Sequence, residues 1–294
     1  MVSGRPVVLL WTGGWDSTFR LLQLLLLHRL PVAPLYLLDD ARASAPVEIR
    51  TMQRIRKALA ARFPHTRGLL RPTTIARVSD LAPDAAIDRA LDRLADRDGI
   101  GTQYGWLARY YRQRGWRGIE LACDCIPKGA SAVLLERTVA TRAPHGYGTY
   151  RLDPGDPDAD VRLVFGGFGF PLIATTREHM LEIMRDNDWT DLMGMTWFCH
   201  RPAHGVPCGL CKPCRANIEE GFGWRIPRRR RALSAVYRYT LLPVRMGARR
   251  VVLRLRVLAA GGRALNIPRP ARRPPEQRGR LHASHSHQGS GCPK

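Results

Sequence analysis

Two short segments of this 294-residue chain combine residue types that bind phosphate and metal ions. The first, Thr12–Thr18, has the sequence TGGWDST and follows an apolar run at Pro6–Trp11. Glycines allow main-chain N–H groups to turn toward a phosphate, and a helix start adds positive partial charge. Ser17 and Thr18 add hydroxyl donors, and Asp16 is suited to capping the helix or to binding Mg²⁺. The spacing excludes the GxxxxGK[ST] and GxGxxG loops, while a plain tight turn with an N-cap stays an alternative.

The second segment is a cluster of cysteines. Four of the seven cysteines lie close together, at Cys199, Cys208, Cys211 and Cys214. Two overlapping CxxC pairs bring thiolates within reach of one tetrahedral ion, and four cysteines close its coordination shell. The spacing therefore predicts a Zn²⁺ ion that supports folding. An iron–sulfur cluster and four reduced core cysteines are the alternatives, and His200 and His204 are not expected to be ligands.

The hydropathy pattern predicts an α/β frame around these segments. Apolar runs at Pro6–Trp11, Val32–Leu38 and Gly118–Cys123 predict buried parallel strands. Helices are expected at Thr18–Leu30, Pro46–Phe63, Ala85–Asp96, Thr102–Gln113 and Thr176–Asn187, with a shorter one near Arg215–Glu220. Strands that alternate with helices imply a doubly wound parallel sheet. The Gly-, Pro- and Asp-rich segment Ala143–Val161 is expected to be an exposed loop.

The charge of the chain is unevenly distributed. The 47 basic and 25 acidic residues give a net charge of +22, and 18 of the basic residues but only one acidic residue lie in Arg225–Lys294. We therefore expect a nearly neutral globular part followed by an arginine-rich, largely disordered tail at 225–294. Such a tail binds polyanions non-specifically by counterion release, although a solvated extension without a specific role is the simpler interpretation.

Two further features bear on the location of the protein. The longest apolar stretch, Phe19–Leu38, is interrupted by charged residues and prolines, so no bilayer span is expected. The first residues lack the apolar core and cleavage site of a signal peptide. We therefore expect a cytoplasmic protein, in which clustered cysteines bind metal more often than they form disulfides.

The turn after the first predicted strand resembles the SGGxDS[T] pyrophosphate loop of the N-type ATP pyrophosphatases, with threonine in place of the first serine. That resemblance implies a Rossmann-like (adenine nucleotide alpha hydrolase-like) sheet with helices on both faces, and ATP and Mg²⁺ as cofactors. It further implies that the enzyme adenylates a carbonyl or carboxyl oxygen and releases pyrophosphate, with Asp16 and Ser17 acting in catalysis. The phosphates and their Mg²⁺ would be held by Thr12, Gly13, Gly14, Asp16, Ser17 and Thr18.

The cysteine segment Phe198–Arg215 resembles the C-terminal motif of the 7-cyano-7-deazaguanine synthases, a CGxCxxC-like sequence followed by arginine. Gly169–Leu172, ahead of a predicted helix, is similar to their TPL segment. The resemblance covers Pro6–Gly223 and implies an ATP-dependent C–N ligase with a structural zinc, which uses ammonia. A homodimer is the oligomeric state that we consider for it. It divides the chain into a pyrophosphatase domain at 1–190, a zinc lobe at 191–224 and the tail at 225–294.

The segments that would recognise the acceptor differ from that family. Asp39–Arg42 stands where the family has a tyrosine–glycine–glutamine–arginine–histidine-like stretch, and Thr175–Glu178 lacks the family's lysine. The expected acceptor is therefore 7-carboxy-7-deazaguanine or a related acid. Two other functions stay open. One is a tRNA-modifying or thiolating enzyme with Cys123 or Cys125 carrying sulfur, and the other is a non-catalytic, zinc-stabilised nucleic-acid-binding protein.

Some polar residues are weaker candidates for the nucleotide or acceptor site. Asp124 ends a predicted inner strand, where open α/β sheets bind ligands, but its neighbours are equally well explained as small residues at a strand end. Asp39 and Asp40 either approach the nucleotide or begin the next loop. Lys128 and Arg177 are expected at solvated positions.

Overall fold

Seven strands form one sheet in the computed structural model, which describes residues 4–126 and 128–240. The strands are β1 (Val7–Leu10), β2 (Val32–Leu38), β3 (Thr74–Arg77), β4 (Ile119–Glu120), β5 (Thr138–Arg142), β6 (Gly148–Leu152) and β7 (Phe168–Gly169). Their order is β3-β2-β1-β4-β7-β6-β5. The strands from β3 to β7 in this order pair in parallel, whereas β6 and β5 continue the sheet antiparallel. The predicted α/β class is confirmed, with a mostly parallel sheet.

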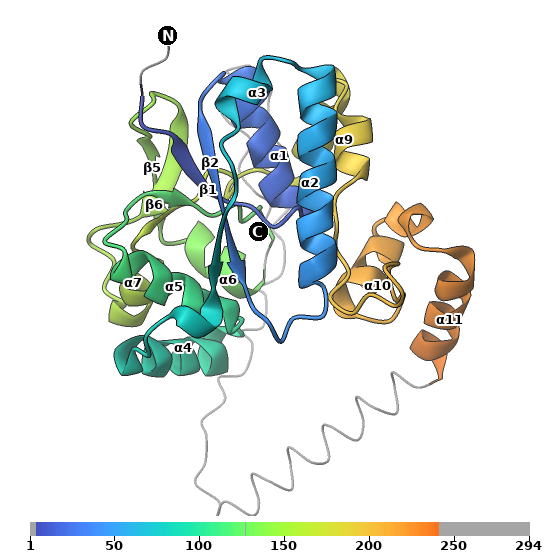
Figure 1. Cartoon of the computed structure of the whole chain (residues 1–294). Helices are drawn as coiled ribbons and strands as arrows, with labels where there is room; N and C mark the ends of the chain where they lie inside the picture. Colours follow the sequence, from blue (N-terminus) through green and yellow to red (C-terminus); the bar gives the residue numbers. More distant parts are fainter. Residues whose placement is uncertain (1–3, 127, 241–294) are drawn as a thin grey trace, which may run out of the picture.

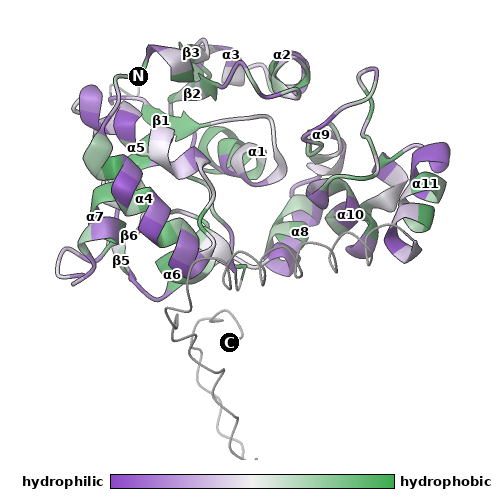
Figure 2. Cartoon of the chain, turned by 90° about the horizontal axis from the view of Figure 1, so that it is seen from below, coloured by the Kyte–Doolittle hydropathy of each residue, from purple (hydrophilic) through white to green (hydrophobic). Residues whose placement is uncertain are grey.

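Helices cover both faces of the sheet (Figure 1). One face carries α1 (Trp15–Leu22) with its π-helical continuation Gln23–Leu27, α2 (Ala45–Arg62), α3 (Thr66–Leu69), α8 (Arg177–Asp186) and α9 (Thr190–Gly194). The other carries α4 (Ala85–Asp98), α5 (Gln103–Gln113), α6 (Gly129–Leu135) and α7 (Ala159–Phe165), with a short 3-10 turn at Val78–Asp80. Successive strand residues point to opposite faces of the sheet. Leu9 therefore packs in the core beneath α1 and α2, and Leu10 packs in the core beneath α4 and α5. In Figure 2 the visible side of α4 is largely hydrophilic, while the central strands are hydrophobic.

The strand order creates a crevice at the centre of the sheet. From β1 the chain moves outward to β2 and β3, and it then returns to place β4 on the other side of β1. The carboxyl ends of β1 and β4 therefore meet at the point where the direction of winding reverses, which is where open α/β sheets bind ligands. The turn at Thr12–Thr18 follows β1, and Asp124 follows β4.

A small lobe lies at one end of the molecule, beside α2 and α9 (Figure 1). It consists of the cysteine loop, α10 (Lys212–Glu219), a 3-10 turn at Phe222–Arg225 and α11 (Arg228–Tyr239). Its buried core contains only three of the cysteines and Ile226, with a few partly buried side chains packed around them. So small an apolar core gives little stability of its own.

Three sequence predictions differ from the structure. The segment expected as an exposed loop contains β6, which pairs with β5 in a hairpin and buries Thr149 and Leu152. The strand expected at Gly118–Cys123 is only β4, two residues long. The beginning of the predicted disordered tail is helical in α11, where Arg238 pairs with Glu219 of α10 at 3.1 Å.

The remainder of that tail, 241–294, lies outside the described residues. Within the described part of the chain, no helix combines the length and the apolar character needed to cross a membrane.

Candidate active site

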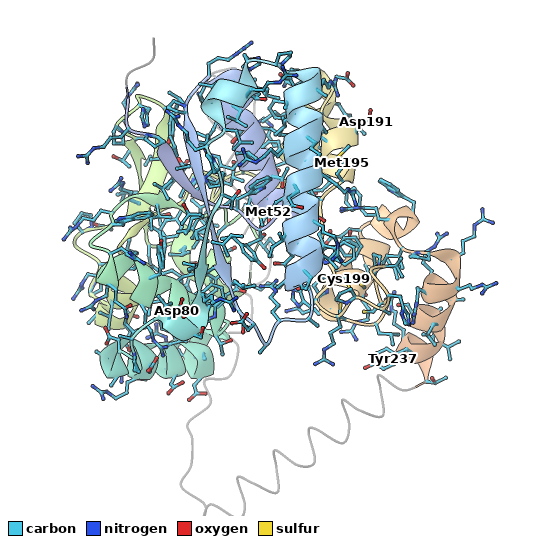
Figure 3. The ribbon with its side chains drawn as sticks, viewed as in Figure 1. Met52, Asp80, Asp191, Met195, Cys199 and Tyr237 are labelled. Carbon is cyan, nitrogen blue, oxygen red and sulfur yellow. The ribbon has the colours of Figure 1, made fainter. Side chains whose placement is uncertain are left out.

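The glycine turn has a conformation that its sequence requires. Gly13 has φ of +69°, in the left-handed region, and a Cβ there would lie 3.2 Å from side-chain atoms of Thr51 and Met52. Met52 is buried on the side of α2 that faces the sheet (Figure 3). The carbonyl oxygen of Gly13 accepts a hydrogen bond from the Trp197 N–H at 2.8 Å. This bond connects the turn to the segment that precedes the cysteine loop of the small lobe.

The two hydroxyl residues at the start of α1 have different roles. The Ser17 hydroxyl lies 3.5 Å from that of Thr12, accepts from the Thr12 N–H at 3.4 Å, and lines a cavity beside the turn. Thr18 is fully buried, and its hydroxyl accepts a hydrogen bond from the Trp11 indole at 3.1 Å. The expected phosphate contact of Thr18 is therefore replaced by a structural one.

A cavity of about 800 Å³ opens in front of this turn, between the sheet and the small lobe that contains the cysteine loop. Thr12, Gly14, Trp15 and Asp16 line one side of it. Its basic side chains come from widely separated segments: Arg42, Lys128, Arg177, Lys212 and Arg225. Its carboxylates are Asp16, Glu48, Asp124, Glu178 and Glu220. Basic groups suit phosphates and carboxylates suit a divalent cation, so this mixture suits a metal–nucleotide complex.

Asp16 and Asp124 face each other across Arg177, which lies 3.7 Å from Asp16 Oδ1 and 3.2 Å from Asp124 Oδ2. Burial is the main reason that the pKa of Asp16 is raised to about 7, and the nearby Asp124 carboxylate raises it further. Burial also raises the pKa of Asp124. Asp16 does not cap α1, whose N-cap is Gly14. Arg177 is thus part of the site, contrary to the solvated position expected for it.

Two buried polar atoms of the turn are available to a ligand. Within the described part of the chain, the Trp15 indole nitrogen has no hydrogen-bond partner, and Asp16 Oδ1 has none besides its longer ion pair with Arg177. Buried polar groups are almost always paired, and each unpaired one costs about 1–3 kcal/mol. The neighbouring Asp16 and Trp15 therefore mark the wall of the cavity where a ligand or ion is expected.

Arg225 belongs to the small lobe and contacts Trp15 of the glycine turn. Its guanidinium lies 4.7 Å from the ring centroid of Phe198 and 5.9 Å from that of Trp15, and it donates to the Thr196 hydroxyl at 2.8 Å. Burial, together with Arg177, lowers its pKa to about 10, which leaves it charged at neutral pH. Arg225 is expected in the arginine-rich tail, but the structure places it in the wall of the cavity.

Arg42 is held by a buried network at the end of β2. Glu48 is 4% exposed and accepts hydrogen bonds from Tyr36 at 2.8 Å and Ser44 at 2.7 Å, and Arg42 lies 3.1 Å from it. Arg42 lines both the large cavity and a smaller one of about 270 Å³. The smaller cavity has a mixed lining, in which Leu37 and Trp106 form part of the apolar wall.

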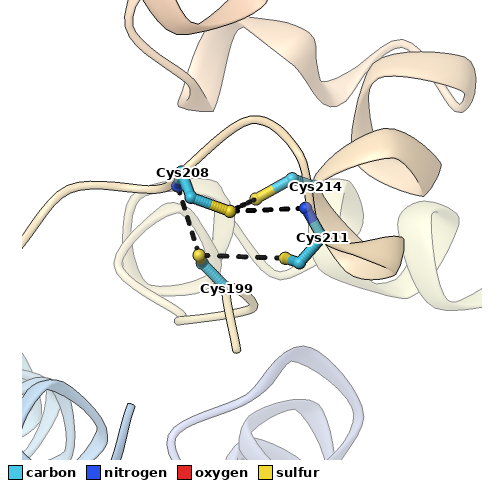
Figure 4. Close-up of side chains that lie close together, drawn as sticks. All are labelled: Cys199, Cys208, Cys211 and Cys214. Carbon is cyan, nitrogen blue, oxygen red and sulfur yellow. Dashed lines mark hydrogen bonds between the residues drawn. The ribbon is translucent and has the colours of Figure 1, made fainter. Parts of the chain in front are cut away.

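The four cysteines converge as their spacing predicts (Figure 4). Their sulfur atoms all lie within 4.8 Å of one another, and the Cys208–Cys214 and Cys199–Cys211 pairs are each 3.9 Å apart. A tetrahedron of sulfurs about 2.3 Å from one Zn²⁺ has edges of about 3.8 Å, so the group could hold one metal ion such as zinc. A cluster of several irons is larger than one ion and needs sulfurs set further apart.

Main-chain groups support this arrangement. The N–H of Cys208 donates to Cys199 Sγ at 3.2 Å, and the N–H of Cys211 donates to Cys208 Sγ at 3.3 Å. Such bonds favour thiolates, the form that ligates metal. Neither His200 nor His204 belongs to the sulfur group.

Other candidate residues lie outside the cavity. Asp40 pairs with Arg77 at 2.7 Å in an exposed position, and Asp39 accepts from the Ala41 N–H at 3.0 Å, so these two carboxylates build the turn after β2. Cys123 is buried, and burial raises the pKa of its thiol to about 12. Lys128, in contrast, lines the cavity although it is exposed.

Comparison of the sequence with protein-family models and with curated proteins found no match. The function is therefore argued from the geometry of the cavity and of the cysteine group, together with the two motifs.

Proposed function

We propose that this chain is an ATP-dependent ligase with the Rossmann-like fold of the N-type ATP pyrophosphatases. The observation that carries the proposal is the position of the turn Thr12–Thr18. It follows the central strand at the switch point of the sheet, begins a helix, and lines a cavity that contains both basic groups and carboxylates.

Each part of a metal–nucleotide complex has a suitable partner in the two cavities. The main-chain and hydroxyl donors of Thr12, Gly14 and Ser17 suit the phosphates, and Arg42 and Arg177 supply charge from neighbouring elements. Oxygen ligands for Mg²⁺ would come from Asp16 and Asp124, with Arg177 moving from the carboxylates to the phosphates. The smaller cavity, with the apolar side chains of Leu37 and Trp106 and polar groups beside them, is suited to the nucleoside.

The reaction that this arrangement supports is adenylation. An acceptor carboxylate oxygen attacks the α-phosphorus, pyrophosphate leaves, and ammonia then displaces AMP from the acyl adenylate to give an amide and a released proton. An amide oxygen would attack the α-phosphorus in the same way, with loss of pyrophosphate. The chain's own contribution is to align the two substrates and to stabilise negative charge, for which no side-chain nucleophile is needed. Bound Mg²⁺ would neutralise charge on the phosphates.

The acceptor that we propose is 7-carboxy-7-deazaguanine or a related acid. The support is the resemblance of Phe198–Arg215 to the synthase motif and the presence of the aromatic Trp197 and Phe198 in the wall of the same cavity. Zinc at the four cysteines would have a structural role, because four thiolates leave it no open position. A cytoplasmic location remains a prediction.

The two alternative functions have less support than the ligase. A thiolating enzyme needs a reactive cysteine. The buried Cys123 with its raised pKa stays a thiol at neutral pH, whereas Cys125 lines the large cavity, so alanine at Cys125 that abolishes product but spares adenylation would favour this alternative. The tail that would bind nucleic acid lies mostly outside the described residues.

The proposal is tested by measuring AMP and pyrophosphate release from MgATP and ammonium, first with 7-carboxy-7-deazaguanine and then with other carboxylates. We expect acceptor-dependent release by the wild-type chain and none by the Asp16→Ala/Ser17→Ala variant. Release that is unaffected by both substitutions would place the reaction elsewhere. No release with any acceptor from folded, zinc-loaded protein would argue against a ligase.

A further inference from the structure

A second large cavity, of about 720 Å³, lies at the opposite end of the sheet from the glycine turn. Val7 and Val8 at the start of β1 and Ile119 at the start of β4 contribute to it, whereas the first cavity lies at the carboxyl ends of the same strands. The two cavities share no lining residue. We propose that this second cavity binds a phosphorylated ligand of mononucleotide size.

Its charge is the first argument. Arg5, Arg117 and Arg151 line it, and within the described part of the chain no hydrogen bond or ion pair engages any of their guanidinium groups. The single carboxylate in the lining, Glu120, is already bound through both oxygens to the buried Arg20, at 2.7 and 2.9 Å. Three unneutralised guanidinium groups around one cavity repel one another unless an anion joins them.

A buried hydroxyl in the lining gives independent support. Thr149 is 4% exposed, and its Oγ1 has no hydrogen-bond partner within the described residues. A threonine hydroxyl beside arginines is a typical donor to a phosphate oxygen. The backbone of Gly118 also makes room for one of the arginines. Its φ is +77°, and a Cβ there would lie 2.7 Å from a terminal nitrogen of Arg151.

The volume of the cavity and its aromatic side chains indicate a nucleotide as the ligand. A volume of about 720 Å³ falls within the range of roughly 300–1,000 Å³ typical of small-molecule sites. His145 lies parallel to Tyr147, with 6.3 Å between ring centroids, and Trp116 is 37% exposed. Rings of this kind stack on a nucleobase while the arginines bind its phosphate. A free phosphate would use the arginines alone.

The test uses the full-length chain with Asp16→Ala and Ser17→Ala, so that the glycine turn no longer competes for the probe. Binding of radiolabelled AMP is measured by equilibrium dialysis on this parent, on the parent carrying Arg117→Gln and Arg151→Gln, and on the parent carrying the control Arg89→Gln. Arg89 is exposed on α4, outside the cavity, and the C-terminal tail is identical in all three proteins.

We expect AMP to bind the parent and the control equally, and to bind the double arginine variant at least about tenfold more weakly, because charge-assisted hydrogen bonds are lost. Adenosine, which lacks the phosphate, should bind at least about tenfold more weakly than AMP to the parent. Equal AMP binding by all three proteins, or no binding by the parent, would overturn the proposal.

Hydrogen exchange gives a readout that does not depend on the arginine variants. In the parent, AMP should slow exchange at 115–120 and 143–151 and leave 12–18 unchanged. Protection confined to 12–18 would assign AMP to the glycine turn and contradict a second site.

Discussion

Replacing Gly13 by alanine should damage the candidate active site through geometry alone. The left-handed backbone at φ of +69° costs an alanine about 1–2 kcal/mol. The new methyl group would lie 3.2 Å from Thr51 Cγ2 and Met52 Cγ and 3.4 Å from the main-chain oxygen of Glu48. Such overpacking typically costs about 1–3 kcal/mol, so the free energy of unfolding should fall by about 2–5 kcal/mol in total.

Gly99→Ala is the matched control for this substitution. Gly99 ends α4 with φ of +68°, and a Cβ there has no neighbouring atom within 4 Å. Its substitution should therefore cost only the backbone term of about 1–2 kcal/mol. Urea unfolding of both variants measures the difference that the crowding at Gly13 produces.

The same two variants separate stability from function. A shift of the turn displaces the groups that bind phosphate, and a misplacement of about 1 Å can lower a rate by about 100-fold. Gly13→Ala should therefore lose most AMP formation at a temperature where it is still folded, whereas Gly99→Ala should keep it. Equal stability and equal AMP formation in the two variants would refute the argument that the turn needs glycine for its function.

Three further predictions concern the side chains around the cavity and the metal group. Burial raises the folded-state pKa of Asp16 to about 7, above its unfolded value near 3.8, so ionising it opposes folding as the pH rises between these values. Asp16→Asn should then stabilise the fold at pH 8 but not at pH 3.5 in urea unfolding, while abolishing AMP formation; destabilisation at pH 8 would contradict this. Arg177→Gln should leave Asp16 and Asp124 facing each other without a cation, and should raise the KM for MgATP by about tenfold or more with little change in secondary structure. Removal of metal from the four cysteines by a chelator, or the substitution Cys214→Ser, should unfold the small lobe, because its apolar core is small. The unfolding should be seen as rapid proteolysis after residue 190. A lobe that resists proteolysis equally well after either treatment would show that metal does not hold it together.

The periodic parts of the fold are predictable from the sequence. The strand Val32–Leu38 and the long helix after it show clear apolar patterns, and the structure places β2 and α2 there. The helix predicted at Thr176–Asn187 is α8, and Thr176 is its N-cap, since its hydroxyl accepts from the His179 N–H at 3.2 Å. The cysteine group is equally local, since the CxxC spacing by itself brings the sulfurs together.

The contacts between distant segments could not be predicted in the same way. Arg177 meets Asp16 and Asp124 only because the switch point brings the ends of β1 and β4 beneath the start of α8. Arg225 is surrounded by arginines in the sequence, so its composition indicates a solvated tail, yet it packs on Phe198 and Trp15. The sequence does not indicate the hairpin of β5 and β6, because its strands are short and lack apolar alternation, and Gly and Pro residues lie in its turn.

The most direct test of the account follows the oxygen that the acceptor donates. 7-Carboxy-7-deazaguanine labelled with ¹⁸O in its carboxylate is incubated with MgATP, ammonium and the full-length chain, and the AMP is analysed by mass spectrometry. Adenylation at the α-phosphorus predicts one ¹⁸O atom in the phosphate of each AMP formed. Unlabelled AMP, or ADP and phosphate as the products, would show that the chain does not join the acceptor to the α-phosphorus and would contradict the central claim.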